Sequence, residues 1–70
     1  MRIEITREIV GNKIEYRINS DEQLDESGKK TFTVDSLDVL FDWLYDVRDR
    51  CRVFGKLFEV VRKPTQLKLY

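Results

Sequence analysis

Residues 2–18, RIEITREIVGNKIEYRI, decide the fold of this 70-residue chain. Apolar and polar side chains alternate on both sides of Gly11-Asn12, as they do in two half-buried strands that a two-residue turn joins. If Val10 pairs with Lys13, the isoleucines of both strands share one face, because side chains alternate along a strand. The stretch therefore predicts an antiparallel β-hairpin with one apolar face.

A long helix is predicted for residues 36–53. Its apolar residues recur at three- and four-residue spacing, which places them in one broad stripe on the helix surface. The stripe comprises Leu37, Leu40, Phe41, Leu44, Val47, Cys51 and Phe54. Asp35 is expected to cap the first turn, and Gly55 follows the last turn, where a left-handed residue is favoured. We expect this helix to cover the apolar face of the hairpin.

Three shorter runs complete the predicted fold. Residues 30–34 (KTFTV) favour a short strand, and residues 57–61 (LFEVV) are apolar on both faces except for Glu59, which favours a central strand. Residues 67–70 suggest a last strand that pairs with the preceding one. The prediction is a single α+β domain over residues 1–70. Its order is β-β-β-α-β-β, with a small, mostly antiparallel sheet and one amphipathic helix packed on one face.

The composition argues against several classes of protein. The chain carries 13 basic and 13 acidic side chains, so a generic coat for nucleic acid and an acidic DNA mimic are both disfavoured. No run approaches the ~20 apolar residues of a membrane span, and residues 1–13 lack the apolar run of a signal peptide. A single cysteine suits a reducing compartment, so the expected location is the cytoplasm.

The sequence offers no set of side chains typical of catalysis or metal binding. Histidine is absent, and Cys51 lies within the apolar stripe, which favours a buried thiol over a nucleophile. One cysteine without histidine cannot form a Cys₄ or Cys₂His₂ zinc site. The three glycines are scattered and form no phosphate-binding loop. We therefore predict a protein that is not an enzyme and that uses no cofactor and no metal.

The zero net charge is the sum of two opposed blocks. Residues 21–49 carry nine acidic and three basic side chains, whereas residues 50–70 carry one acidic and six basic side chains. The acidic block places three aspartates at four-residue spacing on one helix face, where their repulsion costs stability. Trp43 lies at the border of this face, and tryptophan is enriched in interface hot spots. The leading hypothesis is a module that binds a basic surface of a larger protein through Asp38, Asp42, Trp43 and Asp46.

Two alternatives and one analogy accompany this hypothesis. The basic C-terminal third would bind nucleic acid weakly through Arg50, Arg52, Arg62, Lys63 and Lys68. The second face of the sheet, where Leu57, Val61 and Val10 are expected to lie uncovered, would join two copies into a structural homodimer. Motif-free chains of this size also occur among accessory proteins of phages and other mobile elements, which inhibit a larger host protein; this is an analogy of class only.

Overall fold

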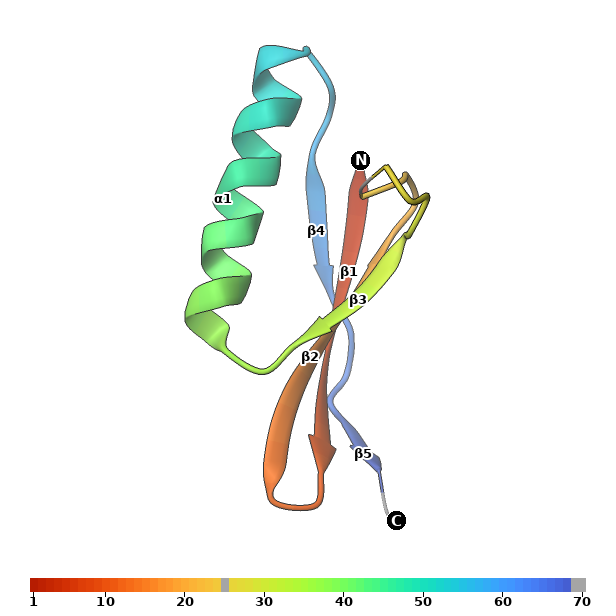
Figure 1. Cartoon of the computed structure of the whole chain (residues 1–70), viewed down its shortest axis with the longest axis vertical. Coiled ribbons are helices and arrows are strands. Elements are labelled where there is room, and N and C mark those ends of the chain that lie inside the picture. The colour runs from red at the N-terminus through yellow and green to blue at the C-terminus, as the bar shows by residue number, and fades with distance from the viewer. Residues whose placement is uncertain (25, 69–70) are drawn as a thin grey trace.

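The protein is described by a computed structural model that covers residues 1–24 and 26–68, as five strands and one helix (Figure 1). The elements are β1 (Arg2–Val10), β2 (Lys13–Ser20), β3 (Thr31–Val34), α1 (Leu37–Val53), β4 (Glu59–Arg62) and β5 (Gln66–Lys68). The strands form one sheet in the order β3-β2-β1-β4, and β5 pairs with β1 as well. This confirms the predicted α+β fold and its order of elements.

The hairpin of β1 and β2 has the predicted register. Val10 pairs with Lys13 and Ile9 with Ile14, so the isoleucines of the two strands lie on one face. Gly11 has a φ of +60°. No described residue other than glycine has a positive φ, so the φ of Asn12 is negative. A glycine at the first of two turn positions is typical of a type II′ turn, whose twist matches that of the flanking strands.

Helix α1 begins at Leu37, one residue later than predicted. Ser36, not Asp35, is the N-cap: its hydroxyl accepts a hydrogen bond from the backbone N–H of Val39 at 3.5 Å. At the other end the prediction is confirmed, since Gly55 adopts a φ of +67° just beyond the helix. The backbone N–H of Lys56 donates to the carbonyl of Cys51 at 2.8 Å. This 6→1 bond is part of a Schellman motif, which satisfies the last carbonyls of the helix.

Strands β4 and β5 differ from the prediction. Strand β2 is antiparallel to both β1 and β3, so β3 runs parallel to β1. Helix α1 then returns the chain, and β4 also runs parallel to β1. The expectation of a central strand in residues 57–61 is wrong, since β4 lies at the end of the sheet. Strand β5 pairs with β1 rather than forming a hairpin with β4. Pro64, which has no N–H to donate, separates the two. Leu69 and Tyr70 lie outside the described residues.

The core lies between α1 and the apolar face of the sheet. Its fully buried apolar residues are Ile3, Ile18, Leu40, Val47 and Cys51. Cys51 is a free, buried thiol, as predicted. Three residues of the predicted stripe, namely Leu37, Phe41 and Phe54, are exposed instead. The core therefore follows only part of the stripe.

The face of the sheet opposite α1 is closed by charged side chains. Glu8 is only 2 % exposed there, with carboxylate oxygens 2.8 Å from Arg17 Nε and 2.6 Å from Lys68 Nζ. Buried Thr6 lies on the same face. Of the three apolar residues expected on this face, Val10 and Val61 lie there, whereas Leu57 precedes β4 and is 88 % exposed, outside any strand.

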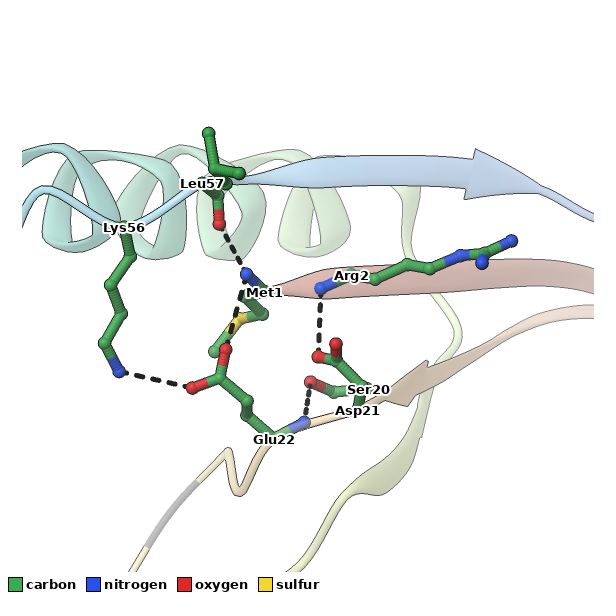
Figure 2. A network of polar contacts seen from close by, with 7 residues as sticks. All are labelled: Met1, Arg2, Ser20, Asp21, Glu22, Lys56 and Leu57. Atoms are coloured by element: carbon green, nitrogen blue, oxygen red, sulfur yellow. Dashed lines mark hydrogen bonds and ion pairs between the residues drawn. The ribbon is translucent and has the colours of Figure 1, made fainter.

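A polar network closes the end of the sheet where the helix terminates (Figure 2). The N-terminal ammonium donates to the carbonyl of Leu57 and lies 3.3 Å from Glu22 Oε2. The other Glu22 oxygen accepts a hydrogen bond from Lys56 Nζ at 3.2 Å. The hydrogen bond from Lys56, followed by the one from the ammonium, holds the pKa of Glu22 below its usual value. The network joins the loop after β2 to the loop after α1.

Candidate functional site

A groove of about 370 Å³ opens between α1 and the sheet. Its apolar lining consists of Ile5, Leu37, Leu40, Phe41, Leu44 and Val60. Tyr16 and Thr65 contribute hydroxyl-bearing side chains, and Arg7, Arg62 and Lys63 contribute the charged ones. The groove is thus formed by one side of α1, by the centre of β1 and β2, and by the end of β4.

The groove exists because one helix is narrower than this sheet. Four strands about 4.8 Å apart place the outer strand axes about 14 Å apart, whereas a helix with its side chains is about 10 Å wide. Helix α1 packs toward β3, where Trp43 meets the ring of Phe32 edge-on with centroids 4.7 Å apart. On the helix side, Val60 of β4 is left 41 % exposed, whereas Ile3, its neighbour on β1, is buried.

The side chains that border the groove are apolar and in contact with water. Leu37 is 44 % exposed, Phe41 is 47 % exposed and Val60 is 41 % exposed. A second hollow continues along α1 toward its C-terminus, where Phe41 and Leu44 are joined by Tyr45 and Phe58. Together they form one apolar surface along one side of the helix. We call this surface the α1–β4 groove.

The charged residues of the α1–β4 groove are all basic. The guanidinium groups of Arg7 and Arg62 have no ion-pair or hydrogen-bond partner within residues 1–24 and 26–68. Lys63 Nζ lies 3.5 Å from Glu4 Oε1, and the guanidinium of Arg48 lies 5.1 Å from the centre of the Tyr45 ring. The groove therefore combines an apolar floor with two unpaired guanidinium groups at one end.

The four residues of the leading sequence hypothesis do not share one surface. Asp38, Asp42 and Asp46 are exposed and lie four residues apart on α1, away from the groove. We call these three residues the acidic ridge. Trp43 is half-buried and packs against the core beside Phe32. The three aspartates therefore lie together, whereas Trp43 packs α1 against β3.

The five basic residues of the nucleic-acid alternative occupy three places. Arg50 and Arg52 lie in the last turn of α1. Arg62 and Lys63 lie at the groove. Lys68 lies on β5 and is paired with buried Glu8. These residues do not form one continuous basic surface.

Sequence reasoning missed the α1–β4 groove because it assigned Leu37 and Phe41 to the core. One feature of the sequence pointed to it: Arg7 interrupts the apolar alternation of β1 between Ile5 and Ile9. An arginine at an inward position indicates that the sheet is not covered there, since an unpaired charge is rarely buried. Arg62 occupies the equivalent face of β4, opposite Ile5.

Comparisons of the chain with protein-family models, curated proteins and solved structures find no match. None of the helical structure in the described residues is long and apolar enough to cross a bilayer. In the same part of the chain, no cluster of three or more acidic, histidine or cysteine side chains is placed to hold a metal ion. The α1–β4 groove is thus the candidate site.

Proposed function

We propose that this protein is a non-enzymatic binding module that acts by occupying a surface of a larger protein, with the α1–β4 groove as its contact surface. The leading hypothesis from the sequence was the same function, with Asp38, Asp42, Trp43 and Asp46 as the contact. The proposed contact surface differs because exposure to water has a different free-energy cost for each of the two surfaces. Aspartates are well solvated at a helix surface, whereas exposed Leu37 and Phe41 gain free energy when a partner covers them.

One observation carries the proposal: Leu37, Phe41, Tyr45 and Val60 are exposed around a single groove next to the core. Single exposed apolar residues are ordinary on protein surfaces, but a contiguous patch with a charged border is typical of an interaction site. Nucleic-acid binding, self-association and the analogy with accessory inhibitors stay predictions. The contact through Asp38, Asp42, Trp43 and Asp46 likewise stays a prediction.

Photo-crosslinking tests the proposal. Phe41 is replaced by p-benzoylphenylalanine in the full chain, which is expressed in cells of its source organism and irradiated. We expect a discrete adduct with one other protein, identified by mass spectrometry. Val53 is the matched control, since it is 79 % exposed on α1 and lies outside the lining of the groove.

Three results would overturn the proposal. The first is the same set of adducts from both positions, which would indicate random collision. The second is an adduct at Val53 alone, and the third is no adduct at Phe41 at all. A crosslink between two copies of the chain would indicate self-association in place of binding to a larger protein.

A further inference from the structure

We infer that the occupant of the α1–β4 groove is an acidic amphipathic helix of the partner protein, which lies beside α1. This inference rests on the proposed function and adds the chemistry of the ligand. The pattern of exposed apolar residues along the groove and the charge at its end support it.

A row of exposed apolar residues beside the groove fits one helix. The groove opens between α1 and the sheet, with Leu37 and Phe41 on its helix side. Leu37, Phe41 and Tyr45 lie four residues apart along this edge, over about 12 Å of helix axis. Two turns of a partner helix would therefore place apolar residues at i, i+3 or i+4, and i+7 against them.

The charge at the end of the groove selects an acidic partner. Arg62 pairs in register with Ile5, and Arg7 lies two residues further along the same face of β1. The two guanidinium groups therefore come from neighbouring strands and border the same cavity. Both are unpaired in the part of the chain that the structure describes. Carboxylates on the flank of a partner helix would accept charge-assisted hydrogen bonds from them.

Charge also argues against a second copy as the occupant. The side of α1 that carries Phe41 and Tyr45 carries Arg48 as well. Two copies that met through this side would bring their arginines together, and like charges across an interface disfavour association. A separate partner with carboxylates beside its apolar residues meets no such repulsion.

Synthetic peptides of about 14 residues, or about four helical turns, test the inference on the full chain. The acidic probe has leucine and phenylalanine at helical spacing with glutamate on both flanks, and the basic probe has lysine in place of each glutamate. Both carry a fluorophore for anisotropy titration. We expect the acidic probe to bind more tightly than the basic probe by about tenfold or more, and its affinity to fall as salt rises.

Paired variants locate the recognition. Arg7→Gln combined with Arg62→Gln is expected to weaken binding of the acidic probe by about five- to tenfold, as the loss of two partly solvated ion pairs does. Arg50→Gln combined with Arg52→Gln is the matched control, because it removes the same charge from the exposed last turn of α1. This control is expected to change the affinity by less than about twofold. Phe41→Glu and, separately, Val60→Glu should each abolish binding.

The outcomes separate the inference from the proposed function. If Phe41→Glu and Val60→Glu abolish binding but both probes bind equally, or the arginine pairs have equal effects, the groove stands and the acidic partner is overturned. If neither probe binds, the helical partner is overturned. The helical partner is also overturned if the groove instead binds laurate, a fatty acid tested as a third probe. In both cases crosslinking at Phe41 still decides the proposed function. If the acidic probe binds the two groove variants as tightly as wild type, both proposals fail.

Discussion

The two faces of the sheet are closed in different ways. The face that carries α1 is apolar, and the helix buries Ile3 and Ile18 but leaves Val60 and Phe41 exposed, so the α1–β4 groove stays open. The opposite face carries no helix, yet it is closed by ion pairs between strands, with Glu8 held between Arg17 and Lys68. The comparison shows that the way in which a face of the sheet is shielded from water depends on the chemistry of its side chains. Four predictions test this conclusion.

The largest effect is expected from two neighbours on α1 that lie on the covered and open parts of the helix face. Leu40 is buried and Phe41 is about half exposed. Leu40→Ala should lower the free energy of unfolding by about 2–5 kcal/mol, because it leaves a cavity in the core. Phe41→Ser should lower it by about 1 kcal/mol or less, because the ring already contacts water. Urea denaturation measures both, and equal losses would mean that the groove belongs to the core.

The outer face should respond to the loss of a single charge. Glu8→Gln is expected to destabilise the protein by about 1–3 kcal/mol, since the buried site keeps two cations without their carboxylate. Arg17 and Lys68 are partly exposed and can regain water, which limits the cost. Glu15→Gln is the matched control, because Glu15 lies directly opposite Glu8 on β2. It should change stability by less than about 0.5 kcal/mol or increase it slightly. Equal effects of the two variants would contradict a face closed by specific ion pairs.

A smaller effect of opposite sign is expected on the outer side of α1. Asp42→Lys removes two repulsive contacts, with Asp38 and Asp46, and replaces them with attractive ones. It should raise the free energy of unfolding by about 0.5–1 kcal/mol. The gain should shrink in 0.5 M salt, because the charges are exposed. A loss of stability would show that the acidic ridge supports the fold.

The smallest effect concerns pH and the network around Glu22. Its folded pKa is lowered, so its contribution is present above the usual glutamate pKa of about 4.3 and is lost as the pH falls through the folded value. Wild type should therefore exceed Glu22→Gln in stability at pH 7, with the difference vanishing as the pH falls through the folded pKa of Glu22. Urea denaturation across this range measures it. A difference that persists in acid would mean that the ion pairs with Lys56 and the N-terminus do not contribute.

Much of the fold was predictable because it depends on short patterns in the sequence. The Gly11-Asn12 turn and the alternation around it determined the register of β1 and β2 residue by residue. Gly55 marked the helix end because a left-handed residue is needed there. Ser36 rather than Asp35 caps the helix, and both residue types are good N-caps, so the sequence did not discriminate between them.

The site was less predictable because it depends on how much of the sheet one helix covers. The periodicity of α1 showed which residues could face the sheet, but the width of the sheet decides which of them do. Leu40 is buried and Phe41 is exposed although both belong to the same apolar stripe. Strand β4 was placed wrongly for a related reason: its apolar character on both faces does not distinguish a central strand from an edge strand that borders a groove.

One measurement compares the two candidate contact surfaces most directly. The partner identified by crosslinking is captured with immobilised wild type, with Phe41→Glu and with Asp42→Lys, two adjacent positions whose side chains point about 100° apart around the helix. Circular dichroism confirms that each variant is folded. The groove account predicts that Phe41→Glu loses the partner and that Asp42→Lys retains it. Retention by Phe41→Glu together with loss by Asp42→Lys would contradict the account and favour the acidic ridge.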